Sequence, residues 1–384
     1  MSMTATPTTL SAEERGAILS AVREFAASRL EPNALDWDRR KHFPRDVLVE
    51  AGELGLGGVY VSDDVGGTGL SRRDSAAVFE ALAAGDPTIA AYISIHNMVA
   101  WMIDTFGTDD QRRRWLPNLV AMTELGSYCL TEPGAGSDAA AITTSAIPDG
   151  DEYVLTGVKQ FISGAGAAAV YVVMARTGAP GAKGITAFLV PADAAGLSFG
   201  PDEHKMGWNA QPTRQVILDE VRVPASAVLG EVGAGFRIAM KGLNGGRVNI
   251  AACSIGGAQW ALDRAVRYVH ERFTFGEALA ERHTVVFALA DMATQLQAAR
   301  ALVQGAARAI DEGAPDVAVQ CAMAKRFATD AGFEVANQAL QLHGGYGYLQ
   351  EYGIEKVVRD LRVHQILEGT NEIMRVIIGR GVLG

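Results

Sequence analysis

Hydrophobic residues in the first 125 positions recur at the three- and four-residue spacing of amphipathic helices. Ser11 and Glu14 are spaced as a helix-capping box, and an apolar face with Val22 and Phe25 follows them. No strand-helix-strand alternation interrupts this region. We therefore predict an N-terminal α-helical domain over residues 1–125, with later helices beginning after Pro44, after Ser71, at Thr88 and at Thr108.

The pattern changes near residue 126 to short runs rich in β-branched and aromatic residues. Glycine, proline and aspartate separate these runs at the spacing of a compact antiparallel sheet or barrel. We predict a central antiparallel β domain over residues 126–234. Its expected strands are residues 153–156, 158–161, 170–175, 185–190, 215–218 and 221–223.

Helical periodicity returns at Gly235 and continues to the end of the chain. Breaks at Gly313-Ala-Pro315 and Gly344 separate long helices joined by short connections, and a short last helix follows Thr370. This predicts a four-helix bundle over residues 235–384. The whole chain is then a multi-domain α+β protein. It has neither G-x-G-x-x-G after a strand nor a Walker A sequence, so neither NAD nor ATP is indicated.

Composition narrows the class of protein. The 384 residues are 48% hydrophobic and 20% charged, as in ordinary globular proteins, and the net charge of −10 argues against nucleic-acid binding or an anionic membrane surface. The three cysteines have no paired spacing, and the seven histidines form no metal-ligand pattern. The first residues lack a targeting pattern, and no uncharged run is long enough to cross a bilayer. We expect a cytoplasmic protein without a metal or membrane insertion.

Three stretches carry candidate chemistry. Glu368 lies between Ile366-Leu367 and Gly369, so its carboxylate would be poorly solvated and a candidate base of raised pKa. An ordinary acid at a helix start would look the same. The glycines of 344–347 would let the backbone approach a planar ligand, or they would only stop a helix. The loop 128–138 could bind a polar heterocycle or a phosphate through its main chain, whereas residues 161–163 could equally be plain sheet packing.

Residues 129–141 and 341–360 resemble the two sequence signatures of the acyl-CoA dehydrogenase family. The resemblance extends over nearly the whole chain and implies a helical domain, a β domain and a four-helix bundle. It also implies one FAD per subunit, a homotetramer, an acyl-CoA substrate, and electron-transfer flavoprotein as the electron acceptor. The implied reaction is desaturation of the acyl thioester between Cα and Cβ.

Within that family, Asn244-Gly245-Gly246-Arg247 most resembles the isobutyryl-CoA dehydrogenase branch. Each glycine inside a helix costs about 1 kcal/mol relative to alanine. Room for a branched acyl chain or a close helix crossing would each offset that cost. The isovaleryl-type branch keeps its base at the position of Gly246, so the resemblance leaves Glu368 as the base, assisted by its own backbone N–H. The residues implied in substrate binding are Ser137, Asn244, Gly245, Gly246, Arg247 and Arg380.

The resemblance also implies the FAD contacts. Arg272 would meet the pyrophosphate, with the neighbouring subunit as a possible source, and His283 stands where the family commonly has glutamine. The implied contacts are Tyr128, Leu130, Thr131, Gly136, Ser137, Phe161, Ile162, Ser163, Arg272, Phe275, Arg282, His283, Gln341, Leu342, His343, Gly344, Gly345, Thr370, Asn371 and Glu372.

Other functions remain open at this point. A flavin oxidase or monooxygenase would use the same architecture with oxygen as the acceptor, and a straight short-chain acyl-CoA would suit the same chemistry. A non-catalytic helical assembly protein could also retain the fold. Other carboxylates compete less well with Glu368: Glu132 is interpreted as structural, and Glu355 and Asp360 as members of a solvated or ion-paired helix face.

Overall fold

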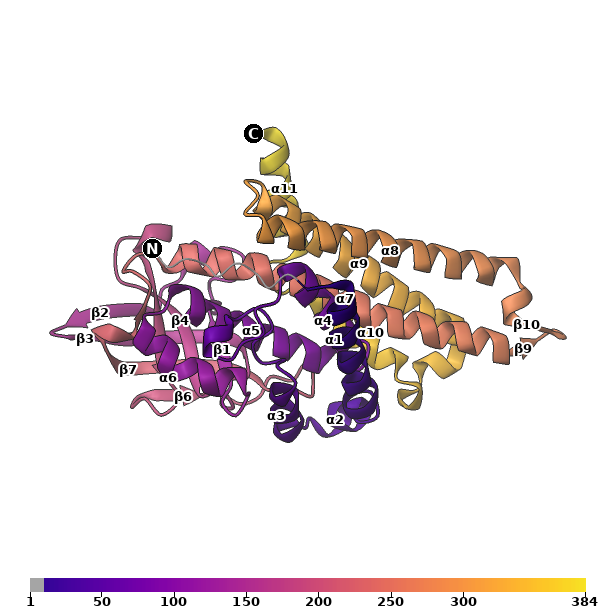
Figure 1. The fold of residues 1–384 in the computed structure, drawn as a ribbon, viewed down its shortest axis with the longest axis horizontal. Coiled ribbons are helices and arrows are strands. Elements are labelled where there is room, and N and C mark those ends of the chain that lie inside the picture. Colours follow the sequence, from indigo (N-terminus) through magenta and orange to yellow (C-terminus); the bar gives the residue numbers. More distant parts are fainter. Residues whose placement is uncertain (1–9) are drawn as a thin grey trace.

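The structure, a computed structural model, describes residues 10–384. The N-terminal part is helical, as predicted (Figure 1). Ser11 and Thr108 both form capping boxes, and the Ser71 hydroxyl accepts a hydrogen bond from the Asp74 N–H. The elements are α1 (Ala12–Phe25), η1 (Ala26–Leu30), α2 (Ala34–Arg40), α3 (Arg45–Glu53), η2 (Asp63–Val65), α4 (Arg72–Ala83), α5 (Pro87–Phe106) and α6 (Asp109–Val120).

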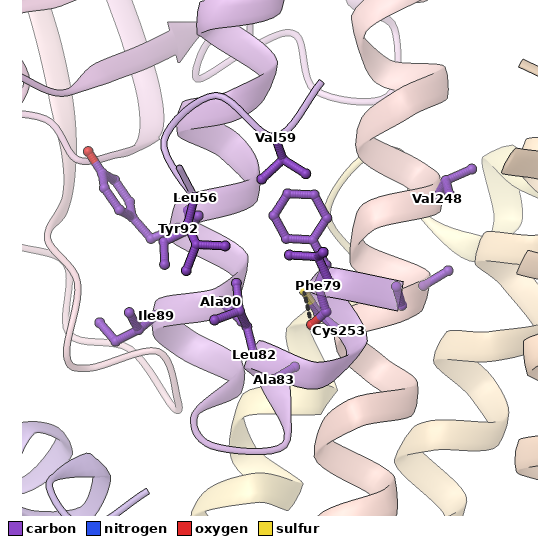
Figure 2. Close-up of a cluster of buried hydrophobic side chains, with 14 of the residues drawn as sticks. Leu56, Val59, Phe79, Leu82, Ala83, Ile89, Ala90, Tyr92, Val248 and Cys253 are labelled. Carbon is purple, nitrogen blue, oxygen red and sulfur yellow. Dashed lines mark hydrogen bonds between the residues drawn. The ribbon is translucent and has the colours of Figure 1, made fainter. Parts of the chain in front are cut away.

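The core of this region continues into the C-terminal helices. Figure 2 shows Phe79 and Leu82 of α4 packed among Val59, Ala90 and Val248, which come from a loop, from α5 and from the long helix α7 (Gly235–Glu271). All of these side chains are almost completely buried. The N-terminal helices and the bundle therefore share one hydrophobic core.

The central sheet is mixed, whereas the sequence predicted an antiparallel one. Most neighbours are antiparallel, but β1 pairs with β4 in parallel, and β2 meets β4 in parallel at the single pair Ser145 and Arg176. The strand order is β6-β7-β3-β2-β4-β5-β8, with β1 beside β4. The strands are β1 (Gly126–Cys129), β2 (Ser145–Asp149), β3 (Glu152–Ser163), β4 (Val170–Arg176), β5 (Ile185–Pro191), β6 (Leu197–Phe199), β7 (Thr213–Pro224) and β8 (Val228–Leu229).

Two long strands replace four of the predicted short ones. The pairing of β3 with β7 is irregular between Leu155 and Gly157, where a bulge lets the strand continue through the glycine that looked like a break. A Cβ on Gly157 would lie 2.7 Å from the Thr144 Cα, so only glycine fits. The sequence patterns of residues 153–161 and 215–223 therefore each belong to one strand.

The C-terminal region is a bundle of long helices, as predicted. It consists of α7, α8 (His283–Asp311), α9 (Val317–His343) and α10 (Ile354–His364), followed by α11 (Asn371–Leu383). In Figure 1 the hairpin of β9 (Phe273–Thr274) and β10 (Glu277–Ala278) lies at one end of the molecule and the central sheet at the other. Short 3-10 turns complete the chain at Ala139–Ala141, Ala182–Gly184, Ala225–Ala227, Leu279–Glu281, Gly344–Tyr348 and Gln350–Tyr352.

A buried charge cluster joins the three regions. Lys356 Nζ on α10 lies 2.7 Å from Asp360 and 2.8 Å from Asp86, just before α5. Asp360 also accepts hydrogen bonds from the Trp208 N–H of the central region, at 2.7 Å, and from the Thr88 hydroxyl. Burial alone would lower the pKa of Lys356, but the two carboxylates more than offset it, so this pKa is raised. The sequence predicted a solvated or ion-paired face on this helix, and Asp360 and Lys356 are ion-paired and buried.

No helix within residues 10–384 is long and apolar enough to cross a membrane. In the same range, no group of histidine, cysteine and acidic side chains is arranged to hold a metal ion. The three cysteines are buried and unbridged.

Candidate active site

Glu368 lies in the short loop between α10 and α11. Its φ of 56° and the φ of 87° at Gly369 place two successive residues in the left-handed region. This conformation is uncommon for a residue with a side chain and costs about 1 kcal/mol or more, so the surrounding structure must hold it. The Thr370 hydroxyl then caps α11 by accepting from the Ile373 N–H at 3.4 Å.

The carboxylate of Glu368 packs directly against Gly246 of α7. A Cβ added at Gly246 would overlap Oε2 and lie 2.9 Å from Cδ. Oε2 is buried and has no hydrogen-bond partner among residues 10–384. Burial raises the pKa of Glu368 to about 7, although Arg247 and Lys325 lower it in part. A carboxyl group that titrates near neutral pH is suited to accept a proton.

Arg247 holds the backbone of this loop and not the carboxylate. Its Nε donates to the Glu368 carbonyl oxygen at 3.2 Å, and its Nη1 donates to Asn244 Oδ1 at 2.9 Å. The Glu368 N–H donates no hydrogen bond within the described part of the chain. The base therefore keeps both a free carboxylate oxygen and a free N–H.

Each glycine of the pair on α7 allows a different neighbouring side chain to approach the helix closely. Gly246 makes room for Glu368, whereas a Cβ at Gly245 would lie 2.6 Å from Arg72 Nη1. The buried Arg72 guanidinium in turn lies 3.6 Å from the centre of the Tyr60 ring. The sequence left two explanations for the glycine pair: room for a branched acyl chain, or close packing against neighbouring elements. These contacts show the close packing.

Strand β1 brings the Tyr128 side chain close to Glu368. The Tyr128 hydroxyl is buried and has no partner among the described residues, and burial and the Glu368 charge raise the pKa of this phenol. Gly134 and Gly136 face open space, so the main chain there is accessible. Glu132 has the structural role that the sequence suggested. Its carboxylate lies 2.7 Å from Lys159 Nζ. Burial raises the pKa of Glu132, but Lys159 and hydrogen bonds from Thr143 and Thr144 outweigh burial and lower this pKa to about 2.

Phe161 is an exposed aromatic residue held in a strained conformation. It has a φ of 59°, lies in the irregular pairing between Lys159 and Ile162, and is 63% exposed. Ser163 turns inward, where its Oγ accepts from Gln211 Nε2 at 3.3 Å. The plain-packing explanation fits Ile162 and Ser163, but it does not explain Phe161.

A second set of residues implied in FAD binding follows the end of α7 and the end of α9, beside the hairpin of β9 and β10 at one end of the molecule (Figure 1). Gly344 ends α9 with a φ of 57°, and both Gly344 and Gly345 face open space. His343 is buried and stacks on Tyr268, with ring centres 4.3 Å apart. A groove of about 380 Å³ is lined by Arg272, Gln341, Leu342, His343, Gly344, Gly345, Tyr268, Thr274, Leu279, Tyr346 and Leu349.

Several other implied contacts do not line this groove, and some of their side chains are bonded elsewhere in the protein. Phe275 is 96% exposed on the hairpin, Arg282 donates to the Thr274 carbonyl, and His283 stacks on Phe287. Arg380 is exposed on α11. The Asn371 side chain points into the protein and accepts from Lys325, whereas Glu372 is exposed.

Family models cover almost all of the chain. The acyl-CoA dehydrogenase N-terminal domain matches residues 12–123, the middle domain residues 127–221 and the C-terminal domain residues 233–383. The chain belongs to the acyl-CoA dehydrogenase family. Isobutyryl-CoA dehydrogenase, mitochondrial, from Bos taurus is 52% identical to this acyl-CoA dehydrogenase over 371 residues, covering 97% of the chain and 89% of the bovine protein.

Solved structures of acyl-CoA dehydrogenases superpose over the full length. Butyryl-CoA dehydrogenase from Megasphaera elsdenii gives a TM-score of 0.94 at 37% identity and covers 98% of this chain and 100% of its own. A glutaryl-CoA dehydrogenase from Mycobacterium smegmatis, in complex with FADH2, gives 0.91 at 29% identity, with coverages of 97% and 95%. The predicted fold and enzyme class are confirmed.

FAD is the cofactor of this family, and the residues present fit it. The exposed main chain at Gly134 and Gly136 and the exposed Phe161 ring offer open contact surfaces in the central region. The Arg272 groove, with its open glycines, offers a guanidinium and a bare backbone suited to a pyrophosphate. In Figure 1 the hairpin beside the Arg272 groove and the central sheet lie toward opposite ends of the molecule.

Sequence reasoning missed four residues of these sites: Tyr60, Arg72, Tyr268 and Lys325. One signal was present for Lys325, because it follows Cys321 by four positions and lies on the buried stripe of α9. A lysine on such a stripe is unusual, since charged side chains are rarely buried without a function or a partner. Tyr60 and Arg72 gave no signal, because their meeting with α7 depends on tertiary packing.

Proposed function

We propose that this acyl-CoA dehydrogenase desaturates a short, branched acyl-CoA of the isobutyryl type to the 2-enoyl-CoA. Glu368 takes the α-proton, and the β-hydrogen leaves as hydride, so the substrate loses two electrons and two hydrogens. When bound, FAD supplies the hydride acceptor. The observation that carries the proposal is the buried, unpaired Oε2 atom of the half-buried Glu368, which packs against Gly246.

The surroundings of Glu368 supply what the proton transfer needs. An α C–H of a thioester is a weak acid, so the site has to raise the basicity of the carboxylate and stabilise the enolate charge. Desolvation raises the pKa of Glu368 to about 7. Its free N–H is a donor available to the thioester carbonyl, where that charge develops.

The choice of acyl chain rests on sequence similarity. The motif Asn244-Gly245-Gly246-Arg247 resembles the isobutyryl branch, and the bovine protein that is 52% identical is named for that substrate. Within this chain the Glu368 carboxylate occupies the space beside Gly246 and Arg72 occupies that beside Gly245, so the glycine pair is accounted for without the acyl chain.

The division of the FAD-contacting residues supports a homo-oligomer, and we propose a homotetramer. Arg272 and the groove at the hairpin end would serve the FAD of a neighbouring subunit, because within one chain they lie far from the central sheet (Figure 1). Electron-transfer flavoprotein is the proposed acceptor. The bovine relative is mitochondrial by name, and a cytoplasmic location of this chain remains a prediction.

The substrate is tested by mixing the flavin-loaded enzyme anaerobically with isobutyryl-, n-butyryl-, isovaleryl- and octanoyl-CoA. We expect isobutyryl-CoA to bleach the flavin absorbance fastest. Faster bleaching by n-butyryl-CoA would assign a straight-chain enzyme, and no bleaching by any of them would reject the activity. Stoichiometric peroxide in air during turnover would identify an oxidase.

A further inference from the structure

Lys325 is completely buried on α9, directly behind the loop that carries Glu368. Its Nζ donates to the Gly369 carbonyl oxygen at 2.9 Å and to Asn371 Oδ1 at 2.8 Å. The first bond restrains the residue that follows the base, and the second reaches the first residue of α11. Lys325 therefore holds the residue before Thr370 and the residue after it by hydrogen bonds.

No carboxylate forms an ion pair with Lys325 among the described residues. The Asn371 amide group connects it to other neighbours: Nδ2 donates to Thr329 Oγ1 at 3.0 Å and to Asp330 Oδ1 at 2.7 Å. A buried ammonium ion held only by neutral oxygens is costly, and burial lowers the pKa of Lys325 to about 8. The next influence on this pKa is the charge of Glu368, which raises it.

We propose that Lys325 is a positioning residue for the base: it fixes the left-handed turn at Glu368-Gly369 and supplies a positive charge that keeps the carboxylate ionised near neutral pH. This inference rests on the proposed role of Glu368. It assigns Lys325 no contact with substrate or flavin. The site then has two cations, Arg247 and Lys325, that hold successive backbone carbonyls and leave the carboxylate oxygen free to take a proton.

Other ionisable groups lie around Glu368 and Lys325. Arg247 on α7 lowers its pKa as Lys325 does, while Tyr128 on β1 and Tyr60 before α4 are phenols whose pKa values are raised by burial. On α10, burial lowers the pKa of His364 to about 3, so this imidazole is neutral. On α11, Glu372 is exposed. Lys325 is thus the member of the group whose charge changes nearest to the working pH.

The test uses two neutral replacements in the flavin-loaded enzyme. Lys325→Met removes the charge and both hydrogen bonds, and Lys325→Gln removes the charge but keeps a donor. Flavin reduction by isobutyryl-CoA is followed anaerobically from about pH 5.5 to 9.5. The carboxyl stretching band of Glu368, assigned by its loss in Glu368→Gln, is titrated in parallel by infrared difference spectroscopy as a readout independent of turnover.

We expect both variants to shift the midpoint of the rate and of the infrared titration upward by roughly one pH unit, because an opposite charge near a carboxylate lowers its pKa by about that amount or more. Near pH 7 the rate falls about fivefold. Above about pH 9 the Lys325→Gln rate meets that of the wild type, because Glu368 is then ionised in both proteins. Lys325→Met keeps an additional loss at every pH.

Three controls separate charge from structure. Arg326→Met removes the adjacent, partly exposed cation, which pairs with Asp330, and leaves the midpoint unchanged. Thr329→Val removes the hydroxyl that contacts Asn371 but keeps the charge, and it also leaves the midpoint unchanged. Lys325→Arg restores the wild-type midpoint. Equal losses at all pH values in both neutral variants, with an unmoved infrared titration, would overturn the proposal for Lys325. Full activity of Glu368→Gln would instead reject the base itself.

Discussion

The carboxylate of Glu368 occupies the space that a side chain at Gly246 would need. A Cβ there would overlap Oε2 and lie 2.9 Å from Cδ. The position of the base is therefore set by a missing side chain on α7 as much as by the loop that carries it. An acyl-CoA dehydrogenase with this arrangement cannot gain even a methyl group at position 246 without moving its base.

Gly246→Ala is accordingly expected to lower the rate of flavin reduction at least tenfold while the protein stays folded. The methyl group displaces the carboxylate, and small displacements of a catalytic group can reduce rates by roughly a hundredfold. Stopped-flow absorbance with isobutyryl-CoA measures the rate. Gly305→Ala on α8 is the matched control. A Cβ there meets nothing within 4 Å, so it should add up to about 1 kcal/mol of helix stability and leave the rate unchanged. A wild-type rate in Gly246→Ala would contradict the geometry.

The free energy of unfolding should depend on pH in a way that reflects the raised pKa of Glu368. Its folded pKa is about 7 and its ordinary pKa is 4.5, so the fold loses stability as pH rises from 4.5 to about 7, and this loss stays constant at higher pH. Glu368→Gln removes this effect. The variant should gain roughly 2 to 3 kcal/mol near pH 8 and almost nothing near pH 4.5. Thermal unfolding of both proteins across this pH range checks it, and a difference in melting temperature that is the same at every pH would argue against a buried carboxylate.

The cluster of Lys356, Asp86 and Asp360 should be essential to stability. Lys356→Met leaves two carboxylates buried without their cation, which typically costs about 3 to 5 kcal/mol. Arg222→Ala removes an exposed residue that pairs with Asp149 and Glu152, and this should cost less than about 1 kcal/mol. Urea unfolding compares the two variants. Equal losses would mean that the buried cluster is not needed.

Arg272 offers a test of FAD shared between subunits. Arg272→Gln should weaken FAD binding about tenfold or more, because a guanidinium is lost from the groove at the hairpin end. Arg267→Gln, which changes an exposed arginine near the end of α7, just before Arg272 but outside that groove, is the control. Fluorescence titration of the flavin-free protein gives the affinities. Unchanged binding in Arg272→Gln would separate the groove from the flavin.

Much of the architecture was predictable, because local signals determine it. Capping boxes at Ser11 and Thr108 and the breaks after α8 and α9 are short-range features, and the helices begin and end where these features predict. The bulge at Gly157 was not predictable, because a glycine inside a strand has the same sequence signature as a turn. The parallel pairing of β1 with β4 depends on contacts between distant segments, which a sequence pattern does not encode.

The candidate site was predictable only in part, for a related reason. The apolar neighbours of Glu368 indicated a poorly solvated carboxylate, and the structure shows it buried. The contact with Gly246 and the support from Lys325 involve residues more than 40 positions away. Gly246 gave two equally good explanations in the sequence, and only the position of Glu368 in three dimensions distinguishes them.

The most direct test of the central claim is anaerobic flavin reduction by isobutyryl-CoA in Glu368→Gln, with Glu334→Gln, an exposed acid on α9, as the control. We predict that Glu368→Gln binds FAD and reduces it roughly 100 to 10,000 times more slowly than the wild type, while Glu334→Gln matches the wild type. A Glu368→Gln enzyme that reduces its flavin at the wild-type rate would contradict the assignment of this carboxylate as the base.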